Sequence, residues 1–186
     1  MKTFRMMMFV ALAASPLLAQ PREGKNKELS LSGSYQNYST GSSSSSSGAF
    51  LISPRLGFFV LGGLELEPEV VLMFSSGSEA AYMLNGNVSY NFISEGKAVP
   101  FLLAGYGLAN TVPFFNVPLT RIGFSVDVLN LGGGVKAFLR EDIAIRFEYR
   151  FQKFSGQRQS TYSGFSFTQK VDMRIHTVQF GLSVLL

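Results

Sequence analysis

The sequence contains no cysteine and no tryptophan, and its one histidine is His176. The missing thiols exclude disulfide scaffolds, thiolate metal sites and cysteine nucleophiles, and a single imidazole is too little for a histidine-rich metal site. We therefore expect no metal and no cofactor. Charged residues make up only 15% of the chain, against about 25% in a typical domain, while hydrophobic residues make up 46%. This composition excludes a charge-solvated disordered chain and favours a β protein with an apolar surface or a large buried fraction.

Residues 1–19 have the parts of a secretory signal peptide. Lys2 and Arg5 form a positive region, an uncharged apolar run follows from Met6 to Leu18, and Ala19 offers a small residue for cleavage. The run is shorter than the ~20 apolar residues of a spanning helix, which makes an uncleaved anchor the lesser alternative. Cleavage after Ala19 removes two cations and lowers the net charge from +4 to +2. We therefore expect no nucleic acid among the partners.

Alternation with a period of two dominates the rest of the sequence. Between Tyr82 and Phe92, the even positions are apolar, aromatic or glycine, whereas the odd positions are mostly asparagine and serine. Such alternation is typical of a β-strand with one apolar and one polar face. We expect eight strands, most of which show this pattern: residues 29–35, 49–60, 64–74, 82–92, 99–109, 129–139, 143–151 and 178–186.

Three of these segments carry an irregularity. Pro54 cannot donate to a ladder, which predicts a bulge or a strained pairing around it. The apolar positions are even up to Val128 but odd from Leu129 onward, which predicts a bulge or the edge of a membrane at that point. The segment Val99–Ala109 is apolar on both faces, so its sequence does not decide which face is buried.

The connectors between the segments alternate in length. The tight ones are residues 61–63, 94–97 and 140–142, and the mostly longer ones between them are residues 39–48, 75–79, 110–120 and 155–170. Short turns on one side and longer loops on the other are typical of bacterial outer-membrane barrels, whose short turns face the periplasm. We therefore predict an all-β fold, an eight-stranded antiparallel up-and-down transmembrane β-barrel formed by residues 20–186, with both ends of the chain in the periplasm.

Closure of such a barrel pairs every strand and removes the backbone groups that hydrocarbon cannot satisfy. With eight strands the interior is filled by side chains, so the polar faces predict a plug and not a pore. Four cations and four carboxylates fall on those faces: Arg55, Glu65, Glu67, Glu69, Lys136, Arg146, Glu148 and Arg150. We expect Arg55 to lie near Glu69, and Lys136 near Glu148, because each pair flanks a tight turn. The three glutamates of residues 65–69 could alternatively form a cation site.

A soluble barrel of the lipocalin type would show the same alternation with its apolar face turned inward. Two features favour the opposite orientation. The connectors differ in length between the two sides, and aromatic residues gather near strand ends on the apolar face, as membrane interfaces require. These residues are Tyr35, Phe50, Phe58, Phe74, Tyr82, Tyr90, Phe92, Tyr149 and Phe151. We therefore expect apolar side chains to contact lipid and ionic ones to lie inside.

Two hairpins carry a resemblance to a known family. One comprises Pro54–Val60 with Leu64–Leu66, and the other comprises Gly132–Leu139 with Ile143–Arg150. Both resemble recurring hairpins of the small outer-membrane barrels of the OmpX and OmpA-transmembrane type, and the alternation of the whole mature chain is similar to theirs. The resemblance implies a location in the bacterial outer membrane.

The resemblance also implies a partner for the last strand. In this family the strand is read by the barrel assembly machinery, and the signal usually ends in an aromatic residue. Here the final residue is Leu186, so assembly would depend on Phe180 instead.

Barrels of this family serve adhesion, envelope integrity or enzymatic lipid modification on one scaffold. We expect a structural or surface-interaction role among outer-membrane lipids, with a surface ligand bound by the outside loops and no general porin activity. One of these loops contains the serine run Ser42–Ser47. An alternative is a lipid-modifying enzyme in which His176 activates a serine near the outer rim, although an interfacial histidine is the simpler interpretation. A further alternative is a soluble ligand-binding β-barrel.

Overall fold

The structure is a computed structural model that describes residues 25–39, 46–75, 81–92, 96–110, 126–162 and 165–186. The expected signal peptide, residues 1–19, and most of the serine run lie outside these ranges. The strands are β1 (Lys27–Ser39), β2 (Ser46–Leu61), β3 (Leu64–Ser75), β4 (Ala81–Asn91), β5 (Ala98–Ala109), β6 (Val126–Phe138), β7 (Ile143–Tyr162) and β8 (Phe165–Leu185). No helix in these ranges is long and apolar enough to cross a membrane.

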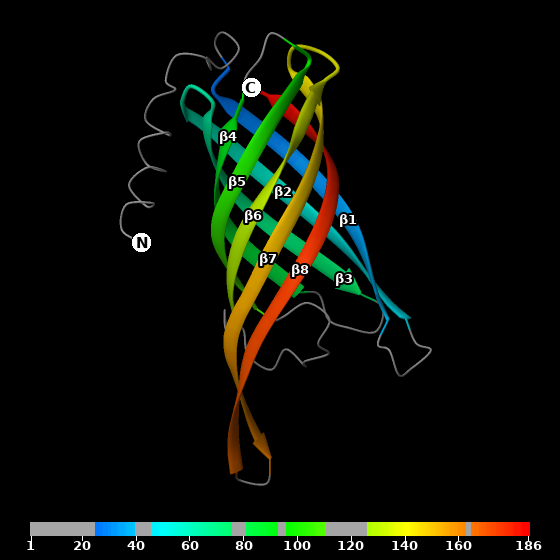
Figure 1. The fold of residues 1–186 in the computed structure, drawn as a ribbon, viewed down its shortest axis with the longest axis vertical. Helices are drawn as coiled ribbons and strands as arrows, with labels where there is room; N and C mark the ends of the chain where they lie inside the picture. The colour runs from blue at the N-terminus through cyan, green and yellow to red at the C-terminus, as the bar shows by residue number, and fades with distance from the viewer. Residues whose placement is uncertain (1–24, 40–45, 76–80, 93–95, 111–125, 163–164) are drawn as a thin grey trace, which may run out of the picture.

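Each strand pairs antiparallel with its neighbours in the chain, and β8 pairs with β1, so the sheet closes into a barrel (Figure 1). The eight-stranded up-and-down fold predicted from the alternation is therefore confirmed. The closure is staggered. The chain of Cα partners that starts at Ser30 and passes once through every strand reaches β8 at Met173, whereas Ser30 itself pairs with Ser183 (an offset of 183 − 173 = 10 residues). Strands with this stagger tilt by about 40° and leave an interior wide enough only for side chains.

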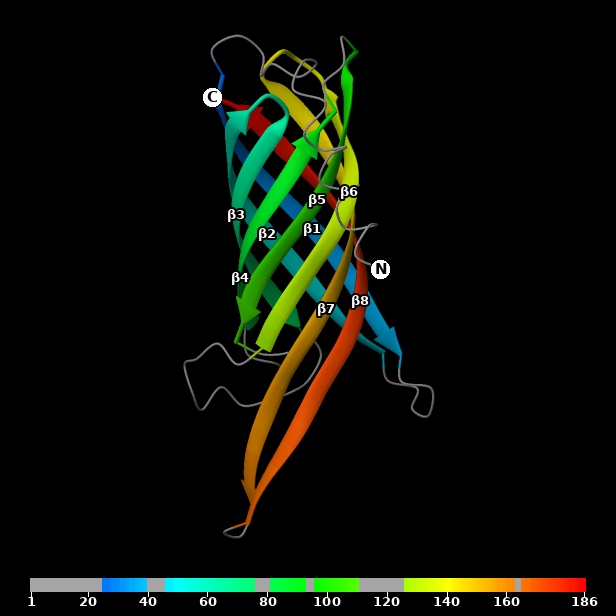
Figure 2. The ribbon, with the colours of Figure 1, turned by 60° about the vertical axis from the view of Figure 1, so that its left-hand side comes forward.

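The two ends of the barrel differ. At one end, here called the terminal end, β1 begins and β8 finishes, and the Leu186 amide donates to the Lys27 carbonyl oxygen at 2.9 Å (Figure 2). The tight turn between β2 and β3 lies at this end, where Gly62 adopts a φ of 51° that favours glycine. The opposite end, here called the loop end, carries the connectors that follow β1, β3, β5 and β7.

The apolar face of the sheet points outward. In β4, Leu84 and Val88 are exposed while Asn85 and Asn87 are buried in the interior. Every strand exposes large apolar or aromatic side chains on its outer face, and leucine, valine, phenylalanine and tyrosine are the common ones. This orientation is the one expected for a lipid-facing wall, and it is the reverse of what a soluble ligand-binding barrel needs.

The structure also shows which face of β5 is buried, a point that the sequence left open because this strand is apolar on both faces. Phe101 and Leu103 of β5 point into the barrel, whereas Leu102 and Tyr106 are exposed on the outer wall. The odd positions of β5 therefore belong to the interior, where Phe101 covers part of the buried charge described below.

The bulges expected at Val128 and at Pro54 are absent. β6 keeps one register with both neighbours along its whole length, so there is no bulge at Val128. The even positions of β6 face inward throughout, and their chemistry changes because the interior itself changes from polar to apolar. Around Pro54, β2 pairs in register with β1, but its ladder with β3 has no pair at Ser53 and Pro54, so the expected disturbance of the pairing is present on that side. The register shift of β2 lies between Phe59 and Leu61, beside the turn.

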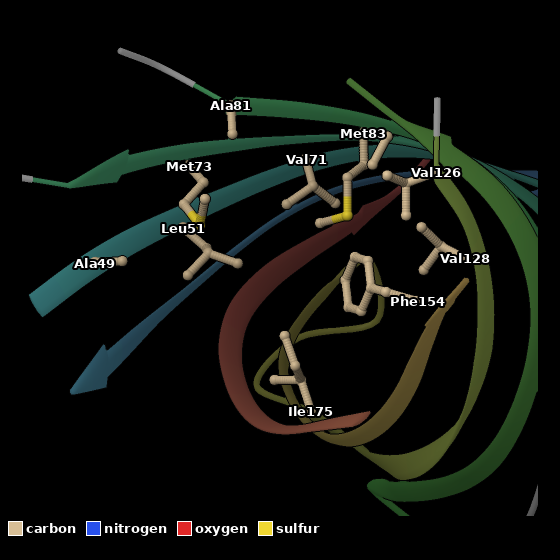
Figure 3. Packing of buried hydrophobic residues seen from close by; sticks show 11 residues of the cluster. Ala49, Leu51, Val71, Met73, Ala81, Met83, Val126, Val128, Phe154 and Ile175 are labelled. Carbon is tan, nitrogen blue, oxygen red and sulfur yellow. The ribbon is translucent and has the colours of Figure 1, made fainter. Parts of the chain in front are cut away.

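The loop-end half of the interior is hydrophobic. Side chains from seven strands meet there, and Phe154 is fully buried among them (Figure 3). The cluster comprises Ala49, Leu51, Val71, Met73, Ala81, Met83, Ala109, Val126, Val128, Phe154 and Ile175. The interior thus has two layers, an apolar one toward the loop end and a charged one toward the terminal end.

Gly134 permits a close approach between β6 and β7. A Cβ at this position would overlap the carbonyl oxygen of Phe147 and lie 2.9 Å from the Phe101 ring, whereas a Cβ at Gly86 would meet no atom nearer than 4.0 Å. We expect Gly134→Ala to lower the free energy of unfolding by about 1–3 kcal/mol, and Gly86→Ala to change it by less than about 0.5 kcal/mol. Urea unfolding in detergent micelles measures both, and equal effects would contradict this packing.

Candidate functional site

The terminal-end half of the interior holds nine charged side chains, each at most 2% exposed. Period-two alternation places them there, because every second residue of a strand points into the barrel. They are Glu28 from β1, Arg55 from β2, Glu65, Glu67 and Glu69 from β3, Lys136 from β6, and Arg146, Glu148 and Arg150 from β7. This set is called the ion network below. Five carboxylates face four cations.

Arg55 spans the interior. Its Nε donates to Glu69 Oε1 at 2.7 Å, on the neighbouring strand, as the shared turn leads one to expect. Its two terminal nitrogens reach the far wall, where Nη1 donates to Glu148 Oε2 at 2.6 Å and Nη2 donates to Gln179 Oε1 at 2.5 Å. One guanidinium therefore links β2, β3, β7 and β8, so it connects strands that share no ladder.

The two arginines of β7 pair with Glu67, Glu69 and Glu148. Arg150 donates to Glu148 Oε1 at 2.7 Å and to Glu69 Oε2 at 2.6 Å. Arg146 donates to Glu148 Oε2 at 3.0 Å and to Glu67 Oε2 at 2.9 Å. Glu148 thus accepts hydrogen bonds from three arginines. Such charge-assisted contacts are the strong class of hydrogen bond, and they offset the cost of burying the charges.

Lys136 has partners other than the expected one. Its Nζ lies 2.6 Å from Glu28 Oε2 and 2.9 Å from Glu65 Oε2. The expected contact with Glu148 is wrong because the register places Lys136 opposite Arg146, while Glu148 lies opposite a glycine. The lysine consequently turns toward β1 and β3.

Glu28 is a network residue that the sequence argument missed. It directly precedes the alternating segment that begins at Leu29, and it shares its parity with Ser30, which is also buried. Extending the alternation by one residue toward the N-terminus would have found it.

Neutral donors from β4 complete the carboxylate contacts. The side-chain amides of Asn85 and Asn87 both donate to Glu69 Oε2 at 3.0 Å, and the Ser89 hydroxyl donates to Glu67 Oε1 at 2.6 Å. Phe101, on the neighbouring strand β5, packs against Arg146, with its ring centroid 4.4 Å from the guanidinium carbon. The network is therefore enclosed by amides, hydroxyls and an aromatic ring as well as by its own counter-charges.

The three glutamates of β3 do not form a cation site. Each has a basic nitrogen within 2.9 Å, supplied by Lys136 to Glu65, by Arg146 to Glu67 and by another arginine to Glu69. In the part of the chain that the structure describes, no cluster of acidic, histidine or cysteine side chains is arranged to hold a metal ion.

His176 lies outside the barrel, on the exposed face of β8. Its Nδ1 is 2.5 Å from the Tyr149 hydroxyl, and its ring centroid is 5.2 Å from that of Phe151. The structure brings the histidine together with two aromatic rings, and within the described residues its hydrogen bond goes to tyrosine and not to serine. This arrangement fits an interfacial side chain.

No family model and no curated protein matches this sequence. Solved structures that match the barrel include Neisserial surface protein A and the N-terminal domain of OprF. Neisserial surface protein A is 15% identical with a TM-score of 0.57, covering 86% of this chain and 96% of its own. The N-terminal β-barrel domain of OprF from Pseudomonas aeruginosa is 14% identical with a TM-score of 0.58, covering 88% of this chain and 100% of its own. Both are eight-stranded outer-membrane barrels.

The chain has the fold of the small outer-membrane barrels. The resemblance seen in the two hairpins of the sequence is thereby confirmed at the level of the fold. The likeness extends over nearly the whole length of both relatives, so this fold accounts for the described strands without an additional domain among them.

Removing one member of the ion network should cost much more than removing an exposed charge. Arg55→Met leaves Glu69 and Glu148 buried with fewer counter-charges, and we expect it to lower the free energy of unfolding by about 3–5 kcal/mol. The pair Lys153–Asp172, at 3.6 Å, is partly exposed on the outside, so Lys153→Met should cost at most about 1 kcal/mol. Urea unfolding in micelles compares the two. Equally small losses would show that the ion network contributes no more to the free energy of unfolding than an exposed ion pair does.

Proposed function

We propose that this protein spans the bacterial outer membrane as a closed barrel, with a structural or surface-interaction role in the cell envelope and without general porin activity. The observation that carries the proposal is the inverted polarity of the barrel. Charged side chains are sealed inside, and large apolar ones cover the outside. A soluble monomer rarely exposes a contiguous apolar surface above a few hundred Å², whereas hydrocarbon requires one.

The outer wall also has the profile of a membrane-embedded surface. Among the described residues, the exposed charges toward the terminal end are Lys27, Lys97, Arg140 and Glu141. Those toward the loop end are Asp127, Lys170, Asp172 and Arg174, with the half-buried Lys153 beside them. Exposed aromatic rings accompany both limits, with Phe58 and Phe92 toward the terminal end and Tyr35 and Tyr106 toward the loop end. A charge-free band between two aromatic girdles is what a bilayer requires of a barrel.

The two interior layers support the proposal of a closed lumen. The ion network occupies the terminal-end half, and the hydrophobic cluster occupies the loop-end half. An ion crossing the barrel would have to separate buried ion pairs and then pass an apolar layer, and both steps are costly. This arrangement supports a plugged barrel.

The surface role is supported by the hairpin of β7 and β8. Pairing between these strands continues to Tyr162 and Phe165, whereas β6 leaves β7 at Gly156. The hairpin therefore projects beyond the other strands at the loop end, which would face the cell exterior (Figure 1). A projecting pair of strands has unpaired edges that are available to other molecules, so we propose that a surface ligand is bound here and by the neighbouring loops.

The assembly of the barrel should depend on β8, the strand that closes the sheet against β1. Phe180 is 61% exposed on its outer face, and Leu186 lies at the end of the same face. We propose that the barrel assembly machinery reads this strand through Phe180.

Substitutions on the two faces of β6 test the orientation in the membrane. Leu131 is exposed on the outer wall, while its neighbour Asn130 is fully buried. We expect Leu131→Arg to place a charge in hydrocarbon at a cost of about 2–4 kcal/mol and to deplete the folded protein, whereas Leu131→Phe and Asn130→Ser should retain it. Fractionation of cell envelopes, with heat-dependent gel mobility as the marker of folding, measures this. Recovery of the wild-type protein from the soluble periplasm would overturn the proposed location.

A further inference from the structure

The ladder that joins β1 to β8 is the shortest of the barrel. It ends at Gly33 and Phe180 after six residue pairs, whereas β1 stays paired with β2 to Ser39 and β8 is paired with β7 from Phe165. Beyond the last pair the two hairpins diverge toward the loop end, as both ribbon views show (Figures 1 and 2). This divergence is called the seam below.

Polar groups line the seam. Among the described residues, a hydrogen bond crosses it from Gln36 Nε2 to Thr177 Oγ1 at 2.6 Å. Ser34 is the first residue of β1 beyond the ladder, and its hydroxyl oxygen lies on the inner side, buried and without a hydrogen-bond partner among the described residues. The facing backbone edges of the two strands share no ladder here. Acyl chains cannot satisfy the backbone groups of these edges, so a ligand of the seam must carry polar atoms, such as the oxygen atoms of a headgroup.

Positive charge lies beside the seam on the outer wall. Lys153 and Arg174 are cross-strand neighbours in β7 and β8. Lys153 lies 3.6 Å from Asp172, whereas Arg174 is exposed and has no ion-pair partner within the described ranges. Lys153, Asp172 and Arg174 together carry one net positive charge, while Asp127 lies farther from the seam, on β6, and accepts a hydrogen bond from the Tyr106 hydroxyl. A guanidinium matches the geometry of a phosphate.

We propose that the seam and this basic group together bind a phosphate-bearing lipid of the outer leaflet. The phosphate contacts Arg174 and Lys153, oxygen atoms of the headgroup meet the free edges of β1 and β8, and the acyl chains lie along Tyr35 and Val178, which are exposed on either side of the seam. The inference rests on the proposed membrane location, since only there does a lipid surround the wall.

The absence of tryptophan from the sequence makes a local optical probe possible. Val178→Trp places an indole beside the seam, and Leu84→Trp places one on β4, half-way round the barrel. The two native side chains are similarly exposed, at 44% and 46%. Each variant is reconstituted into phosphatidylcholine vesicles that contain a minor fraction of either brominated phosphatidylglycerol or brominated phosphatidylcholine. Bromine quenches only indoles that it contacts.

We expect the phosphatidylglycerol probe to quench the Val178→Trp variant roughly three- to fivefold more than the phosphatidylcholine probe, because one or two cations enrich an anionic lipid by about that factor. The Leu84→Trp variant should show no preference. Adding Arg174→Gln and Lys153→Gln to Val178→Trp should abolish the preference. Removing two cations at the terminal end, with Lys27→Gln and Lys97→Gln, should leave it intact.

The outcomes separate this inference from the proposed function. Quenching at both positions without lipid preference, or a preference that survives Arg174→Gln with Lys153→Gln, would overturn the lipid site and leave the membrane barrel standing. A lack of quenching at both positions by either lipid would overturn the membrane location and the lipid site with it.

Discussion

Pairing of buried charge is the constraint on which the rest of this barrel depends. An eight-stranded barrel is too narrow for bulk water, so each ionic side chain inside it must find its counter-charge or a hydrogen-bond donor within the wall. The ion network achieves this with three arginines and one lysine against five carboxylates. Because Arg55 reaches from β2 to β7 and β8, the network also connects walls that share no ladder.

The two layers of the interior fill different halves of the lumen and do so by different interactions. At the terminal end, ion pairs and hydrogen bonds connect the strands. At the loop end, the strands are held by the packing of hydrophobic side chains. Both layers use the same inward positions of the same strands, as in β3, where Glu65 to Glu69 give way to Val71 and Met73. The outer wall shows no such change between its two aromatic girdles, and this apolar band is the basis for the proposed location in a bilayer.

Much of the fold was predictable because alternation is a local property of each strand. It predicted eight strands, the faces of all of them except β5, and the proximity of Arg55 and Glu69, which follows from one short turn. The partners of Lys136 were not predictable in this way, since Glu28 is 108 residues away and meets it only through closure of the barrel.

Alternation within one strand also gave a wrong prediction where the same sequence change can have two structural causes. The change from inward valine at Val128 to inward asparagine at Asn130 resembles a slip in register, yet it marks the boundary between the two interior layers. The facing of β5 required its neighbour, because Gly105 and Gly107 leave room for the amides of Asn87 and Asn85. Neither fact is encoded within a single strand.

The most direct test of the sealed interior is the electrical conductance of the purified wild-type barrel in a planar lipid bilayer. The paired network and the apolar layer predict that insertion leaves the membrane without stable conductance steps. Sustained steps on the scale of an open water-filled pore would show that the interior charges line a channel, and would contradict the account.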